Sequence, residues 1–148
     1  MNIPKFPIIS IYNHSLDIII VEQELTTATV LGVIKGGLDT FAFDSAGIKW
    51  TYKLKTDKVN DNFWTRLLAN TFYNPVVNVI PEWTILGKYD NEELKGIIIN
   101  FVDKDDDILT QFVEAETLKV EINKCTSFEE ICAVLNENIF EFNKKNSC

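Results

Sequence analysis

The stretch FVDKDDDIL, residues 101–109, places four aspartates within five positions, and carboxylates at this density have three chemical uses. They can bind a metal ion, act as acids and bases, or attract a basic partner. Alternate positions carry Asp103, Asp105 and Asp107, Asp106 lies between the last two, and Glu114 stands twelfth counting from Asp103. This spacing matches part of a calcium-binding loop.

An EF-hand loop takes calcium ligands from positions that include 1, 3, 5 and 12, and it needs glycine at position 6 for a sharp turn. Position 6 here is Ile108, and a β-branched residue resists the positive φ that glycine adopts. The flanking segments also resemble strands, and an extended 108–113 would carry Glu114 about 20 Å from Asp107. We therefore expect an acidic hairpin loop over residues 103–107 and no metal.

Few other residues could carry out catalysis. The single histidine, His14, lies in a predicted turn, and the chain has no P-loop, GxGxxG or GxSxG motif. Cys125 and Cys132 have no second pair of ligands nearby, so zinc is not predicted. Paired carboxylates could act across a cleft, but the sequence has 22 acidic residues and no feature that selects two of them. We expect no cofactor and no enzymatic activity.

Charge narrows the class of partner. A net charge of −8 with one arginine, Arg66, argues against nucleic acid and anionic membrane as partners. Residues 1–74 carry 7 acidic and 7 basic side chains, whereas residues 75–148 carry 15 acidic and 7 basic ones. Such one-sided charge is typical of an interaction surface, although a solvated acidic rim would give the same count.

Three features favour a cytoplasmic protein. The three cysteines are odd in number and form no CxxC pair. The first twenty residues lack a clean apolar segment and a cleavage site. No 18 apolar residues run together, so no membrane span is expected.

Period-two alternation predicts strands in the first third of the chain. The strands are expected at 8–12, 16–22, 27–34, 38–43 and 48–55, joined by short turns as in an antiparallel meander. The last of these alternates most cleanly, with Trp50 and Tyr52 on the face that should enter the core.

Helical periodicity appears twice. It predicts a helix over about 61–73, which should bury Phe63, Trp64, Leu67, Leu68 and Phe72 in the core. A capping box of Thr126 and Glu129 opens a second helix over about 127–143. Further strands are expected at 76–80, 82–86, 96–102, 108–113 and 117–123, with one helical turn at 90–95 that Gly96 ends.

The fold class predicted is α+β. Residues 1–148 are expected to form a single globular domain, in which a mainly antiparallel meander of about seven to nine strands is covered by the two main helices.

We expect a non-enzymatic protein-binding protein with an acidic face. Bacterial immunity proteins, which neutralise a cognate toxin that is often a basic nuclease, are similar in size, charge and lack of catalytic motifs, and complementary charge would speed capture of the toxin. The abundance of Lys, Ile and Asn beside one arginine also suggests an AT-rich bacterial genome. The expected contact residues are Asp103, Asp105, Asp106, Asp107, Glu92, Glu93, Glu114 and Glu116. The alternatives are a scaffold or subunit of a larger assembly, and a small-ligand or enzyme module that uses carboxylates; the oligomeric state is not predicted.

Overall fold

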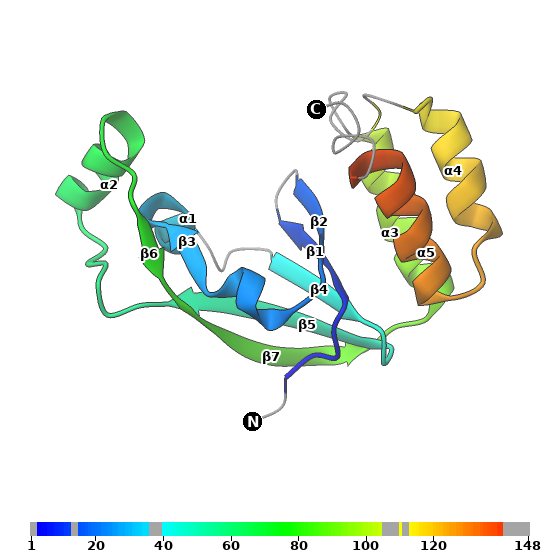
Figure 1. Ribbon diagram of the computed structural model, residues 1–148, viewed down its shortest axis with the longest axis horizontal. Coiled ribbons are helices and arrows are strands. Elements are labelled where there is room, and N and C mark those ends of the chain that lie inside the picture. Colours follow the sequence, from blue (N-terminus) through cyan, green and yellow to red (C-terminus); the bar gives the residue numbers. More distant parts are fainter. Residues whose placement is uncertain (1–2, 13–14, 36–39, 105–109, 111–112, 141–148) are drawn as a thin grey trace. The chain divides into compact units, whose positions relative to one another are not determined.

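A computed structural model describes residues 3–12, 15–35, 40–104, 110 and 113–140 of the protein. Within these residues the fold is α+β, which confirms the predicted class: seven strands form one five-stranded and one two-stranded sheet, together with five α-helices (Figure 1). The chain divides into two compact units, residues 1–87 and 88–148, and each is described by itself. None of the helices in the described ranges is long and apolar enough to cross a membrane.

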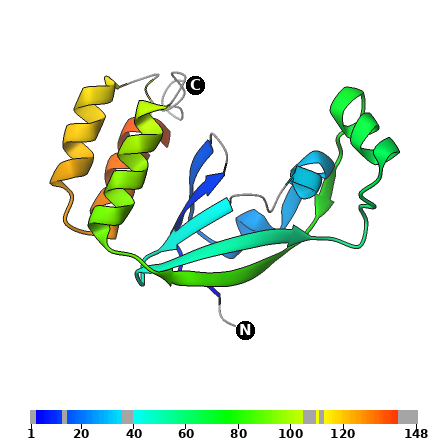
Figure 2. The same cartoon turned by 180° about the vertical axis from the view of Figure 1, so that it is seen from behind.

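The first unit contains the five-stranded antiparallel sheet, in the order β2-β1-β4-β5-β7 (Figures 1 and 2). Its strands are β1 (Ile8–Tyr12), β2 (Ser15–Ile19), β4 (Thr40–Asp44), β5 (Ile48–Lys55) and β7 (Ile80–Lys88). Strands β1 and β5 have the predicted bounds. Clean alternation defines β5, and the turn residues beside both strands define where they end.

One face of this sheet carries the core of the first unit. Alternation along β5 buries Trp50 and Tyr52, as predicted. The buried cluster also includes Ile8, Ile19, Leu25 and Ala42, with Phe6, Ile48, Leu54 and Trp83 packed against it. The Trp83 ring lies 4.7 Å from the Tyr52 ring, centroid to centroid, so aromatic packing joins β7 to β5.

Asp44 organises the turn between β4 and β5. Its Oδ1 accepts hydrogen bonds from the backbone N–H groups of Ala46 and Ile48, both at 2.9 Å. Its Oδ2 accepts one from Trp50 Nε1 at 2.8 Å, and Gly47 supplies the positive φ of 77° that the turn requires. This buried carboxylate therefore has a structural role.

The smaller sheet pairs β3 (Thr27–Thr29) with β6 (Val76–Asn78), and the 3-10 segment η1 (Glu22–Leu25) precedes it. The predicted strand 27–34 is wrong beyond Thr29, because helix α1 (Val30–Lys35) begins there. Thr29 Oγ1 accepts the N–H of Gly32 at 3.1 Å, and Asn74 Oδ1 accepts the N–H of Leu31 at 2.9 Å. These acceptors satisfy amides that the first turn of a helix leaves free.

The second unit is helical. It contains α3 (Asn91–Asp103), α4 (Ala115–Lys124) and α5 (Phe128–Leu135), which continues as the π-helical segment η2 (Asn136–Phe140). The predicted helix 127–143 is confirmed over its described part, but its N-cap lies one residue later than predicted, at Ser127, whose Oγ accepts the N–H of Glu130 at 3.2 Å.

The predicted strands 96–102 and 117–123 are wrong, since both segments are helical. Gly96 lies inside α3, so it does not end a helical turn as predicted. In α4, Leu118 and Ile122 are fully buried while Val120 is 51% exposed, which is the pattern of a helix face.

The prediction of an acidic hairpin loop over residues 103–107 is also wrong. Asp103 is the last residue of α3, and the next described element is the helix α4. The predicted strand 108–113 lies mostly outside the described residues, and so do Asp105, Asp106, Asp107 and His14.

Candidate functional site

The structure separates the described members of the predicted acidic face. Glu92 and Glu93 lie in the first turn of α3, and Asp103 ends the same helix. At a rise of about 1.5 Å per residue these positions are roughly 16 Å apart along the helix axis. Glu114 is the N-cap of α4 and Glu116 is in its first turn. Asp105, Asp106 and Asp107 lie outside the described residues.

Internal lysines pair with three of these carboxylates. Lys119 Nζ contacts Asp103 and lies 2.8 Å from Glu116 Oε1, and these hydrogen bonds raise the pKa of Lys119. Lys95 Nζ lies 2.6 Å from Glu92 Oε1. Part of the predicted acidic face therefore serves to hold helices together, and its charge is partly balanced within the unit.

Lys95 also ties α3 to the end of α4. Its Nζ donates to the carbonyl oxygens of Asn123 at 3.3 Å and Cys125 at 3.2 Å. The contact of Asp103 with Lys119 joins the last residue of α3 to the middle of α4. Helices α3 and α4 therefore run antiparallel, side by side, as in a helical hairpin.

This arrangement removes one argument against a calcium loop, since helices and not strands flank residues 103–114. The argument from Ile108 at position 6 remains. Asp103 already has a cation in Lys119, and no group of three or more potential metal ligands occurs among the described residues.

The thiols of Cys125 and Cys132 are free and poorly suited to nucleophilic chemistry. Burial, with the nearby charge of Glu129, raises the pKa of Cys132 to about 12. Burial, with the charges of Glu130 and Glu121, also raises the pKa of Cys125, although Lys95 acts in the opposite direction. The thiolate is the reactive form, so neither side chain is a candidate nucleophile.

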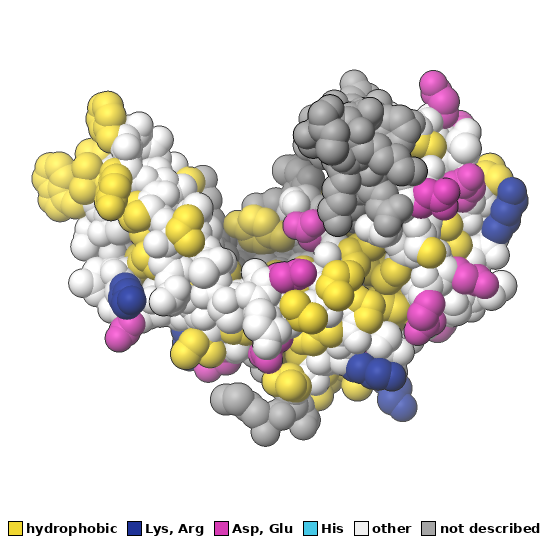
Figure 3. Space-filling model, in the orientation of Figure 1, with side chains coloured by type: hydrophobic (Ala, Val, Ile, Leu, Met, Phe, Trp, Pro, Cys, Tyr) yellow, Lys and Arg dark blue, Asp and Glu magenta, His cyan; other side chains and the backbone are white. Residues whose placement is uncertain are grey.

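The prediction that helix α2 (Phe63–Thr71) buries its apolar residues in the core is wrong. Phe63 and Trp64 are each 69% exposed and Phe72 is 92% exposed, while Ala69 is the buried residue of the helix. Yellow side chains gather over α2 in Figure 3. We call the following set the α2 surface: Phe63, Trp64, Leu67, Leu68, Phe72, Tyr73 and Val76.

Helix α2 forms without burying this stripe because local contacts stabilise it. Asn62 Oδ1 accepts the N–H of Thr65 at 2.9 Å, which caps the N-terminus. Arg66 makes two hydrogen bonds with Asp61, at 2.6 and 2.7 Å, and these lower the pKa of the Asp61 carboxyl. The sequence pattern correctly predicts a helix here, but it does not indicate what faces the apolar side.

A pocket of about 240 Å³ lies over one end of the five-stranded sheet. We call it the sheet pocket. Its apolar walls come from Ile19, Leu25, Gly32 and Leu54. Its polar lining comes from Ser10, Tyr12, Ser15, Asp17, Thr40 and Tyr52, none of which sequence reasoning selected.

The polar groups of the sheet pocket converge. Ser10 Oγ lies 3.1 Å from the Tyr52 phenol oxygen in a buried hydrogen bond. Asp17 is the cross-strand partner of Ser10, so their side chains share a face. Burial, and then the charge of Glu24, raises the pKa of Asp17, and burial raises the pKa of Tyr52.

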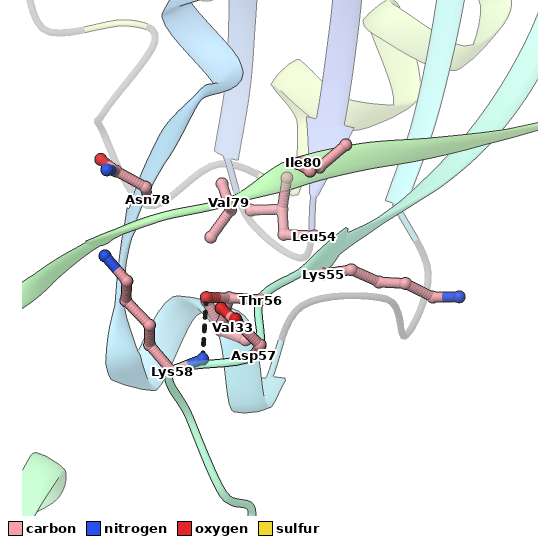
Figure 4. A pocket seen from close by; sticks show the side chains of 9 residues that line it. All are labelled: Val33, Leu54, Lys55, Thr56, Asp57, Lys58, Asn78, Val79 and Ile80. Carbon is pink, nitrogen blue, oxygen red and sulfur yellow. Dashed lines mark hydrogen bonds between the residues drawn. The ribbon is translucent and has the colours of Figure 1, made fainter.

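A larger and more open depression of about 660 Å³ is shown in Figure 4. Residues 54–58 and 78–80 line it together with Val33. Lys55 points away from it and pairs with Glu82 at 2.8 Å, while Thr56 Oγ1 accepts the backbone N–H of Lys58 at 3.2 Å. It contains no buried polar side chain, so we assign it no chemical role.

Comparison with protein-family models, curated protein sequences and solved structures finds no match for this chain.

Proposed function

We propose that the chain is a non-enzymatic protein-binding protein that contacts its partner through the α2 surface. One observation supports this proposal: a helix with a well-formed apolar stripe presents that stripe to solvent. Leaving large apolar side chains in water has a free-energy cost that a partner would remove. Contiguous exposed apolar patches are typical of protein interaction sites.

The size and composition of the α2 surface fit an interface. Its four aromatic residues would each bury about 150–250 Å² if fully covered. With Leu67, Leu68 and Val76 the available area is comparable with the roughly 800 Å² that each partner contributes to a standard interface. Tyr and Trp are also the residue types in which binding energy concentrates.

The charge of the second unit supports a basic partner. Residues 88–148 carry 14 acidic and 7 basic side chains, whereas residues 1–87 carry 8 and 7. The specific form of the proposal is an immunity or inhibitor protein of a bacterial cytoplasm that neutralises a basic toxin domain. Negative charge would speed the encounter, and the α2 surface would supply the lasting contact.

The proposal is tested by photo-crosslinking in cells. A benzophenone amino acid replaces Phe72, and the matched control carries it at Lys53, which is exposed on β5. We expect a protein other than this chain to be crosslinked from position 72 and not from position 53. A crosslink to a second copy would instead favour the assembly-subunit alternative, and no product from position 72 would contradict the proposal.

Once the partner is identified, substitutions distinguish the contribution of the α2 surface to binding from that of the acidic residues. Trp64→Ala should weaken binding at least tenfold and leave its salt dependence unchanged, because the lost contact is apolar. Charge reversal of Asp105 and Asp107 to lysine should lower the association rate and flatten its dependence on ionic strength. If binding and its salt dependence are unaltered by charge reversal, the acidic residues are outside the interface.

A further inference from the structure

Polar side chains occupy one end of a sheet face whose other end is core. Ile8 pairs with Ile19 across β1 and β2, and both are buried. Two positions further along each strand, the corresponding pair is Ser10 and Asp17. Ser10 is 5% exposed whereas Asp17 is exposed, so the face changes here from apolar core to a polar region that is open to solvent.

The same change occurs on the neighbouring strands. Tyr12 pairs with Ser15 on β2 and with Thr40 on β4, and Thr40 is only 3% exposed. Tyr52 reaches over from β5 to the Ser10 hydroxyl. The hydroxyl groups of four strands therefore face one pocket, which Leu25 of η1 and Gly32 of α1 also line.

The charge of the sheet pocket is one-sided. Asp17 is the ionisable carboxylate of its lining, and no lysine, arginine or histidine lies among the described lining residues. Glu24 adds a second negative charge nearby. Asp17 is exposed to solvent, and within the described part of the chain no hydrogen bond or ion pair to its carboxylate is found.

These features select a class of ligand. An anion would be repelled by Asp17 and Glu24, and a neutral molecule would leave the Asp17 charge to solvent alone. An ammonium group would form a charge-assisted hydrogen bond with Asp17 and could also interact with the face of a tyrosine ring. The volume of about 240 Å³ is smaller than the roughly 300–1,000 Å³ typical of pockets for drug-sized ligands.

We propose that the sheet pocket binds a small primary amine with an apolar body. Asp17 holds the ammonium group, the hydroxyls of Ser10 and Thr40 orient it, and Ile19, Leu25 and Leu54 contact the apolar part. The pocket shares no residue with the α2 surface, so this inference is independent of the proposed protein-binding function.

Three probes of nearly equal size test the proposal on the full chain: 2-phenylethylamine, 2-phenylethanol and phenylacetate. They differ chiefly in the charge of the head group. We expect the amine to bind at least about tenfold more tightly than the alcohol, with no measurable binding of the carboxylate, by calorimetry and ligand-observed NMR. Equal binding of amine and alcohol, preferred binding of phenylacetate, or no binding of the amine would overturn the proposal.

Variants locate the site. Asp17→Asn keeps the shape of the side chain and should abolish the preference for the amine over the alcohol. Asp57→Asn, which removes an exposed carboxylate of the same unit outside the sheet pocket, should leave all three affinities unchanged. If Asp17→Asn binds the amine as tightly as the unaltered chain does, Asp17 is not the ammonium site and the proposal fails.

Discussion

The phenol oxygen of Tyr52 lies 3.1 Å from the hydroxyl oxygen of Ser10, and this hydrogen bond connects β5 and β1 across the intervening strand β4. Ala42 of β4 pairs with Ser10 on one side and with Trp50 on the other, and Tyr52 lies two residues beyond Trp50 on β5. The hydrogen bond therefore crosses β4 diagonally. It joins two buried polar side chains that line the sheet pocket.

Because of this hydrogen bond, we expect the effects of substituting Ser10 and Tyr52 on the free energy of unfolding to be coupled. Tyr52→Phe leaves the buried Ser10 hydroxyl without its partner and should lower the free energy of unfolding by about 1–3 kcal/mol. Ser10→Ala should have a similar cost, and the double variant should lose less than the sum of the two. Urea denaturation of the four proteins measures this coupling, and strict additivity would show that the hydroxyls do not interact.

The ionised form of Asp17 is expected to reduce the stability of the folded chain. Its pKa is raised above the ordinary value of 3.8, so the folded chain holds this proton more tightly than the unfolded chain. Its contribution to stability is therefore full below about pH 3.8 and is lost as the pH rises through the folded-state pKa. We expect Asp17→Asn to unfold at a slightly higher urea concentration at neutral pH, with a smaller difference near pH 4. Lower stability of the variant at neutral pH would contradict this assignment.

Two tryptophans distinguish the α2 surface from the core. Trp50 is 2% exposed and Trp64 is 69% exposed. Trp50→Ala should cost about 3–5 kcal/mol, as large-to-small substitutions in a core do. Trp64→Ala should change the free energy of unfolding by no more than about 0.5 kcal/mol. Comparable losses in the two variants would mean that the chain covers the α2 surface itself.

Helix α4 offers a test of its periodicity. Leu118→Ala removes a fully buried side chain and should cost about 2–5 kcal/mol, whereas Val120→Ala changes a half-exposed one. A strand with the predicted alternation would bury both residues on the same face, and both substitutions would then be costly. Thermal unfolding of the two variants distinguishes the helical period of 3.6 residues from the strand period of two.

The sequence predicted best where periodicity and turn residues agreed. The segment IKWTYKLK, residues 48–55, alternates without a break and follows a turn that contains Gly47, and β5 occupies those residues. The segment TLKVEIN, residues 117–123, alternates equally well, yet Leu118 and Ile122 are also spaced for a helix. Period two and period 3.6 both place residues four apart on one face, so packing decides.

Two local signals in the sequence argue against a helix where α3 forms. The isoleucines 97–99 favour a strand by propensity, and glycine is typical of the position that follows a helix. Asp90 Oδ1 accepts the N–H of Glu93 at 2.8 Å and begins the helix. Burial of Leu94, Ile98 and Val102 along one face then outweighs the intrinsic preference of the isoleucines.

The sequence itself contains one signal of the sheet pocket. The turn residues between the segments 8–12 and 16–22 favour a hairpin, and in the observed register Ser10 lies opposite Asp17. Two polar residues facing each other beside a run of isoleucines mark a break in the apolar face. The contributions of Leu25, Gly32 and Tyr52 could not be predicted, because they depend on how η1, α1 and β5 meet in space.

The ammonium group of Lys95 has a consequence for chemical labelling. Its side chain is 8% exposed, and its Nζ is held by Glu92 and by the carbonyls of Asn123 and Cys125. An acylating reagent needs a free amine lone pair, which a charged, hydrogen-bonded ammonium group does not offer. Acylation of Lys95 would therefore lag behind that of the more exposed Lys124, and a sudden gain in its reactivity would report that α3 and α4 have separated.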